Sequence, residues 1–389
     1  MDFRLGDDAE ALRKEVRAFV AEHLTDEMRE TMERTGTHHF PAFARAMGER
    51  GWVAPAWPAA EGGAAMGVLE QQVLVGEMQR AKAPVDGILT MMLVADTLRV
   101  WGTPEQQSRV LPRAARGEVL IALGYSEADA GSDVAAARTR AVRDGDQWVI
   151  DGEKMFTSLA HVAEYVFLLT RTSTEGRKHK GLTMFLVPLD TPGITISEVK
   201  TMGGERTNIT SYDAVRVPDS ARVGEVNGGW GVMSTALELE HANGFSTEIE
   251  RILDVAVEEA SRTGDTARLI DDPLVRVRLA EIAIETEVSR LLELRAAWMY
   301  EVGRHPVAEG PMAKLYSSEA FTRACSNLLD IFGPEGMRRS HGLGTSGTGV
   351  LEHGFRHSQV TRIYAGTSEI QRSLVAERGL GLPRTRSAG

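Results

Sequence analysis

The chain has 389 residues, which is enough for two or three domains that each bury a core. Its 42% hydrophobic and 25% charged residues are typical of a globular protein, and its formal net charge of −11 argues against a nucleic-acid partner. The single cysteine, Cys325, excludes an internal disulfide and a multi-thiolate metal site. The sequence has neither an N-terminal targeting pattern nor a run of about 18 apolar residues, so we expect a cytoplasmic protein without membrane spans.

The N-terminal part, residues 1–117, is predicted to be almost entirely helical. From Asp7 to about Arg34, apolar residues recur at helical spacing behind a pair of aspartates that suits a helix start. A second helix is predicted over about 69–81, and the helical pattern continues through Leu98.

The middle part, residues 118–226, is predicted to be a β domain. It contains short segments rich in β-branched and aromatic residues, separated by glycine, aspartate and proline turns. The predicted strands lie at 119–125, 147–150, 165–171, 182–188 and 209–217.

The C-terminal part, residues 227–389, is predicted to be a helical bundle. Long amphipathic stretches lie at 231–262, 273–303 and 308–332, with a final helix from about 367 to 378. The order of helices, β domain and bundle gives an α+β fold and excludes the alternating strands and helices of a doubly wound sheet.

Two patterns in the last part carry no predicted function. Residues 342–347 match the glycine-rich dinucleotide-binding pattern, but no strand precedes them, so a loop between two helices is the better interpretation. His353 and His357 are four residues apart, but without a third ligand we interpret them as exposed histidines and expect no metal site.

Four short segments stand out, and three of them have groups suited to an anionic, polar or flat ligand. Segment 125–133 (YSEADAGSD) places small and hydroxyl residues after a strand, and segment 154–158 (KMFTS) places an aromatic ring beside two hydroxyls. Segment 202–206 (MGGER) follows in the same domain. Segment 363–371 (IYAGTSEIQ) is a turn that opens into a helix whose first amides are free.

Taken together, these four segments resemble the signature of the acyl-CoA dehydrogenase family. The resemblance extends to 52–58 (WVAPAWP) and 376–383 (AERGLGLP), and so covers nearly the whole chain. It implies an N-terminal helical domain, a central β-sheet domain and a C-terminal four-helix bundle, with FAD as cofactor. It also implies that the α proton and β hydride of an acyl-CoA are removed and that the electrons pass to an electron-transfer flavoprotein.

The resemblance also assigns roles to individual residues. Phe156 stands where the family usually has a tryptophan against the isoalloxazine, and Ser158 where a threonine hydroxyl donates to flavin N5. The implied FAD contacts are Tyr125, Ser126, Gly131, Ser132, Phe156, Ser158, Thr367 and Glu369. The implied substrate contacts are Ser132, His241, Tyr364 and Ala365.

The catalytic base cannot lie where many family members have it. They carry a glutamate in the loop after the tyrosine, and this chain has Ala365 there. Other members, isovaleryl-CoA dehydrogenase among them, carry the glutamate on the first bundle helix, and the matching residue here is Glu240. It lies on the apolar stripe that runs from Trp230 to Gly244, where burial would raise its pKa toward a useful range. The alternative is a rim carboxylate paired with a basic residue such as Arg251.

Two departures from the family pattern affect its expected cofactor contacts across subunits. Segments 262–266 (RTGDT) and 330–336 (DIFGPEG) lack the usual Arg-x-x-Phe-Gly and Gln-x-x-Gly-Gly-x-Gly motifs. The assembly is therefore either a homotetramer or a heterotetramer with a paralogue, as in some actinobacterial enzymes. Two alternative functions stay open, an oxygen-using oxidase or monooxygenase and a catalytically silent partner subunit.

Overall fold

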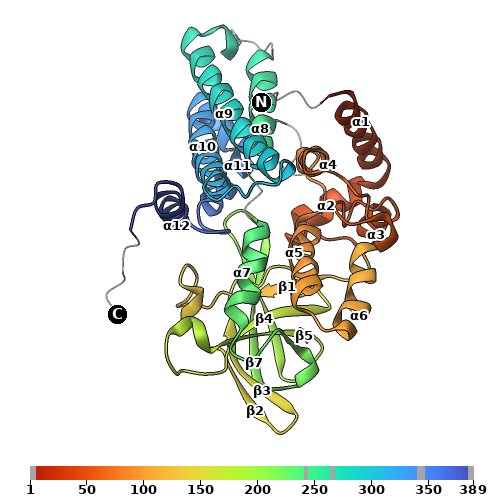
Figure 1. The fold of residues 1–389 in the computed structure, drawn as a ribbon. Helices are drawn as coiled ribbons and strands as arrows, with labels where there is room; N and C mark the ends of the chain where they lie inside the picture. Colours follow the sequence, from red (N-terminus) through yellow and green to blue (C-terminus); the bar gives the residue numbers. More distant parts are fainter. Residues whose placement is uncertain (1–5, 241–243, 263–267, 340–346, 384–389) are drawn as a thin grey trace.

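The computed structural model describes residues 6–240, 244–262, 268–339 and 347–383. Figure 1 shows helices at both ends of the chain and a β-sheet domain between them in sequence, which confirms the predicted α+β architecture. The N-terminal helices are α1 (Gly6–His23), α2 (Asp26–Thr35), α3 (Pro41–Glu49), α4 (Val68–Arg80), α5 (Asp86–Trp101) and α6 (Pro104–Ala115).

The first predicted helix is in fact two helices. Thr25 accepts a hydrogen bond from the amide of Met28 and thereby caps the start of α2, and Gly36 ends that helix in the left-handed conformation. Helix α1 packs on α4 and buries Phe19, whose ring meets Phe43 edge-on at a centroid distance of 5.4 Å.

The sheet has the strand order β6-β7-β3-β2-β4-β5-β8, with β1 paired in parallel to β4. Its most buried strands, β4 and β5, match the predicted ranges, while β2, β6 and β8 are additional strands. The strands are β1 (Ile121–Gly124), β2 (Arg140–Asp144), β3 (Gln147–Lys154), β4 (Tyr165–Arg171), β5 (Leu182–Pro188), β6 (Ile194–Lys200), β7 (Arg206–Pro218) and β8 (Arg222–Val223).

The C-terminal part is helical, but the prediction of one helix over 231–262 is wrong. Helix α7 ends at Glu240 and α8 begins at Ser246, so Gly244 does not continue the apolar stripe of α7. The helices are α7 (Gly229–Glu240), α8 (Ser246–Ser261), α9 (Pro273–Glu301), α10 (Glu309–Phe332), α11 (Gly349–Thr361) and α12 (Ser368–Leu374).

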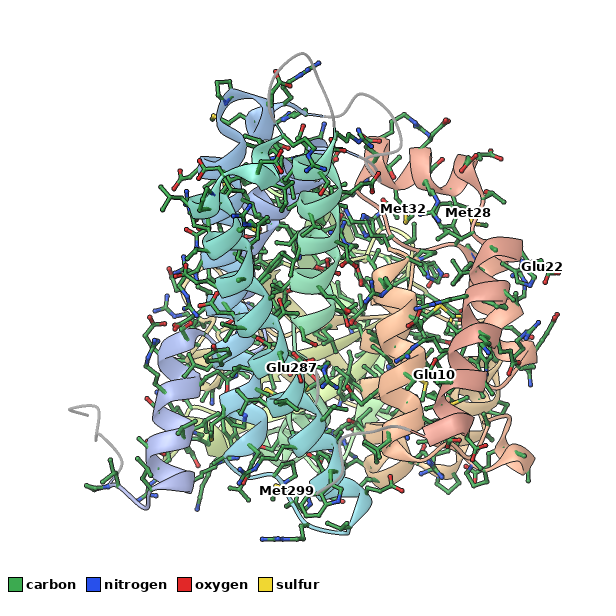
Figure 2. All side chains as sticks on the ribbon, turned by 90° about the horizontal axis from the view of Figure 1, so that it is seen from above. Glu10, Glu22, Met28, Met32, Glu287 and Met299 are labelled. Carbon is green, nitrogen blue, oxygen red and sulfur yellow. The ribbon has the colours of Figure 1, made fainter. Side chains whose placement is uncertain are left out.

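Helix α4 connects the two helical parts. It packs against α1 on one side and against α8 and α9 on the other. Figure 2 shows this arrangement from above, with Glu10 and Glu22 marking α1 and with Glu287 and Met299 marking α9. Among the described residues, no helix combines the length and the apolar character needed to cross a membrane.

Candidate functional site

A buried lysine joins the loop after β1 to the end of β3. The Lys154 ammonium lies 2.8 Å from the Glu127 carboxylate and donates to the Tyr125 carbonyl oxygen at 3.1 Å. The Met155 amide donates to the Ser126 carbonyl oxygen at 2.9 Å. Burial lowers the pKa of Lys154 to about 8. The structure thus brings Tyr125 and Ser126 beside the segment that carries the predicted flavin contacts.

The residues after Lys154 display an aromatic ring and a hydroxyl on the surface. Phe156 has φ +61° and a side chain that is 59% exposed, both unusual for a phenylalanine. The turn is held by β7, because the Thr157 amide donates to the Asn208 carbonyl oxygen at 2.8 Å and the Ser158 and Thr207 hydroxyls lie 3.2 Å apart. Such a strained conformation persists only where the surroundings impose it. A free aromatic face beside an exposed hydroxyl suits a flat heterocycle.

Three other predicted cofactor contacts are exposed. Gly131 and Ser132 lie in the loop after β1, where a Cβ on Gly131 would meet no atom within 4 Å. The loop is fixed at its end by the ion pair of Asp133 with Lys178 at 2.5 Å. Glu369 lies in the first turn of α12, and its pKa is lowered by backbone and Thr367 hydrogen bonds.

The loop before α12 is held in a fixed shape by buried side chains. Ala365 has φ +52° and Gly366 φ +81°, so the backbone turns sharply. The Lys314 ammonium donates to the Gly366 carbonyl oxygen at 2.6 Å, and the buried Gln371 amide donates to that of Ala365 at 2.8 Å. Thr367 caps α12 by accepting from the amide three residues later. The predicted turn that opens into a helix is confirmed.

The predicted base occupies the last position of α7. Glu240 is the final helical residue, the side chains of 237–240 lie outside the described part, and His241 lies outside it altogether. Arg251, the alternative partner named for Glu240, pairs with Glu248 of its own helix, its guanidinium 3.1 Å from the carboxylate.

The start of helix α7 contacts the β domain, and a residue beyond its end contacts the loop before α12. At its start, the Trp230 ring meets the His179 ring at 4.5 Å. Beyond its end, the Phe245 ring lies 6.1 Å from the Tyr364 ring and stacks on Phe321 at 6.2 Å. The region that follows Glu240 in sequence therefore contacts the residue next to Ala365.

A polar cluster at the domain boundary was missed at the sequence level. His353 and His357 are not exposed, because both partly buried rings approach the Glu205 carboxylate, at 3.5 and 2.7 Å. Arg356 adds a 2.7 Å hydrogen bond to the Met202 carbonyl oxygen. The four-residue spacing of the two histidines on α11 was visible in the sequence. Their partner in the β6–β7 loop was not, because only the fold brings that loop next to α11. No group of metal ligands occurs among the described residues.

Burial and hydrogen bonding set the charges of this cluster. Burial acts to raise the pKa of Glu205, but the hydrogen bonds from both histidines outweigh it and hold that pKa far below its usual value. Burial lowers the pKa of His353, whereas for His357 the hydrogen bond and charge of Glu205 outweigh burial and raise the pKa. Burial also lowers the pKa of Lys82, 3.4 Å from His353, to about 8.

The segments that depart from the family pattern make contacts within the chain. Asp330 pairs with Arg278 at 3.2 Å. Arg262 pairs with Glu259 at 3.0 Å, and residues 263–267 lie outside the described part.

Comparisons with known proteins agree along the whole chain. The sequence matches the acyl-CoA dehydrogenase N-terminal domain over residues 6–118, the middle domain over 122–214 and the C-terminal domain over 227–380. Acyl-CoA dehydrogenase FadE26 of Mycobacterium tuberculosis is 36% identical over 96% of this chain and 97% of its own length. Short-chain specific acyl-CoA dehydrogenase of Bos taurus is 31% identical over 87% and 82%.

Solved structures give the same result. The Tcur3481-Tcur3483 steroid ACAD superposes with a TM-score of 0.90 at 36% identity, over 99% of this chain and 100% of the other. The ChsE4-ChsE5 complex from Mycobacterium tuberculosis gives a TM-score of 0.90 at 34% identity over the same shares. The chain therefore belongs to the acyl-CoA dehydrogenase family, whose members are oxidoreductases acting on the CH–CH group of acyl-CoA.

Proposed function

We propose that this protein oxidises an acyl-CoA thioester to the trans-2-enoyl-CoA with FAD as cofactor. The contact between Phe245 and Tyr364 is the observation that carries the proposal. It brings the region after α7 against the loop in which many family members carry the base. A carboxylate at the end of α7 can therefore act where Ala365 cannot.

The proposed cofactor contacts come from the β domain and from the start of α12. Phe156 would lie against the isoalloxazine, and the Ser158 hydroxyl would donate to it. Tyr125, Ser126, Gly131 and Ser132 would line the flavin and the start of the CoA moiety, and Thr367 and Glu369 the phosphate region near α12. When bound, FAD supplies the acceptor for the hydride that leaves Cβ.

Glu240 is the proposed base. An α proton of a thioester is weakly acidic, so it needs a carboxylate that is both close and poorly solvated. Glu240 would take the proton from Cα, and the electron pair left there becomes the new double bond as hydride leaves Cβ. Tyr364 and Ala365, with Ser132 and His241, would line the acyl thioester.

The proposed reaction is tested by mixing the purified yellow protein anaerobically with acyl-CoAs of different length and branching. Bleaching of the flavin absorbance with at least one of them is expected, followed by reoxidation on adding an electron-transfer flavoprotein. Rapid reoxidation by oxygen alone would point instead to an oxidase or monooxygenase. A protein that no acyl-CoA bleaches would contradict the proposal and favour a silent subunit.

Replacement of the exposed Phe156 ring is expected to weaken the binding of FAD. Phe156→Ala removes a stacking surface worth about 1–2 kcal/mol, so the FAD dissociation constant should rise about 5- to 30-fold in a titration of the apoprotein. Val162→Ala is the matched control, because Val162 is exposed on the same segment. Equal FAD affinity in Phe156→Ala and wild type would rule out contact between this ring and the flavin.

A heteromeric assembly is proposed for the active form. One solved relative is the ChsE4-ChsE5 complex, and the name of another, the Tcur3481-Tcur3483 steroid ACAD, joins two proteins. In this chain Asp330 replaces the expected glutamine and pairs internally with Arg278. The chain purified alone should therefore hold less than one FAD per chain, and co-expression with a paralogue should raise the flavin content. One FAD per chain in a homotetramer, by absorbance and light scattering, would favour the homomeric alternative.

A further inference from the structure

The start of α8 has an unusual cap. Its N-cap residue is Phe245, which has no side-chain acceptor for the free amides of the first turn. Glu293 of α9 supplies one from a different helix. Its carboxylate accepts a hydrogen bond from the Ser246 amide at 3.0 Å and a short one from the Ser246 hydroxyl. The Phe245 amide also donates a hydrogen bond to it.

The carboxyl of Glu293 lies directly against the backbone of Gly244. A Cβ on Gly244 would lie 2.0 Å from Oε1 of Glu293, so a larger residue at position 244 would displace this carboxyl. Glu293 is half-buried between the helices, and burial of its carboxyl raises its pKa to about 7 against the hydrogen bonds that lower it. Keeping an acid at such a site is costly, which points to a role that an apolar side chain could not fill.

We propose that Glu293 is a positioning residue for the dehydrogenation, because its carboxyl anchors residues 244–246 between the end of α7 and the Tyr364 loop. Four peptide units separate Glu240 from the anchored Gly244, which keeps their Cα atoms within about 15 Å of each other. The anchored Phe245 also packs against Tyr364 and Phe321. One carboxyl thus holds the residues that follow the helix of the proposed base against the loop that carries Ala365.

This inference rests on the proposed function, and Glu293→Gln tests it. Gln has one oxygen acceptor where the carboxylate has two, so the three donors can no longer all be satisfied. With the best acyl-CoA, the rate constant of flavin bleaching should fall at least about 10-fold while KM changes less than about 3-fold. Ser246→Ala removes only the hydroxyl donor and should give a smaller loss of the same kind.

The matched control is Glu287→Gln. Glu287 lies on the same helix (Figure 2), is exposed and pairs with Arg290 at a hydrogen-bond distance of 2.8 Å. Amide hydrogen exchange over residues 244–252 should speed up at least about 10-fold in Glu293→Gln and stay unchanged in Glu287→Gln.

The outcomes separate this inference from the proposed function. Wild-type bleaching kinetics in Glu293→Gln would overturn the positioning role, even if that variant melted at a lower temperature. Unchanged exchange over 244–252 would overturn the anchor itself, and this readout needs no activity. If no acyl-CoA bleaches the wild-type flavin, the proposed function fails, and the exchange measurement still decides whether Glu293 holds the start of α8.

Discussion

Glu240→Gln is expected to lower the rate constant of anaerobic flavin bleaching by about 10²- to 10⁴-fold with the best acyl-CoA. This is the range lost when a positioned general base is removed. The amide keeps the size of the side chain but cannot accept the α proton. Binding of the acyl-CoA should change little, because the thioester and CoA contacts are untouched, so the loss should fall on the rate constant and spare KM.

Glu238→Gln is the matched control for this variant. Helical geometry turns position 238 about 200° away from position 240, so the two carboxylates cannot serve the same site. Glu238→Gln should bleach within about 2-fold of wild type, because position 238 faces away from position 240 on the helix. Bleaching of Glu240→Gln at the wild-type rate would eliminate Glu240 as base. The base would then have to be another carboxylate near the Tyr364 loop.

The long helices and the buried strands could be predicted from the sequence, whereas the short or polar strands could not. Strands β4 and β5 are buried along almost their whole length, so an unbroken apolar run marks them. Strand β2 has one buried residue in five and β6 alternates weakly, and neither pattern differs enough from a polar loop. Their pairing comes from neighbouring strands, which a local pattern does not contain.

The break between α7 and α8 shows what limited the site prediction. Apolar periodicity continues from Trp230 to Gly244, so one helix was the simplest interpretation. A separate helix α8 begins at Ser246 instead, and its first amides find an acceptor in Glu293, which is 47 residues further along the chain than Ser246. A cap supplied by a distant helix has no signature in the local sequence.

The polar cluster around Glu205 could not be predicted either, because its members are far apart in the sequence. His353 and His357 show only a four-residue spacing, and Glu205 lies about 150 residues earlier, in a different domain. The resemblance to a known family did not reveal it either, since it emphasised segments that bind cofactor and substrate. This boundary gives rise to the largest stability effect that we predict.

Glu205→Gln is expected to destabilise the contact between the β domain and α11 by about 2–4 kcal/mol near pH 6. Removing one partner of a buried pair costs about 3–5 kcal/mol when the other charge stays, and His357 can relieve part of this cost by losing its proton. Urea unfolding followed by fluorescence measures the loss. Glu198→Gln, an exposed substitution on neighbouring β6, should stay within about 0.5 kcal/mol of wild type.

The pH dependence of this loss follows from the two pKa shifts. The pKa of Glu205 is lowered by its histidine hydrogen bonds, so its contribution is present above its unfolded pKa of about 4.5 and is lost as the pH falls further. The pKa of His357 is raised by Glu205, so its contribution is present below about 6.5 and is lost as the pH rises through its folded pKa. The stability difference between wild type and Glu205→Gln should therefore be largest between about pH 4.5 and 6.5 and shrink on both sides. A difference that stays constant from pH 5 to 9 would mean that no protonated His357 faces Glu205, and that the carboxylate is held by neutral hydrogen bonds instead.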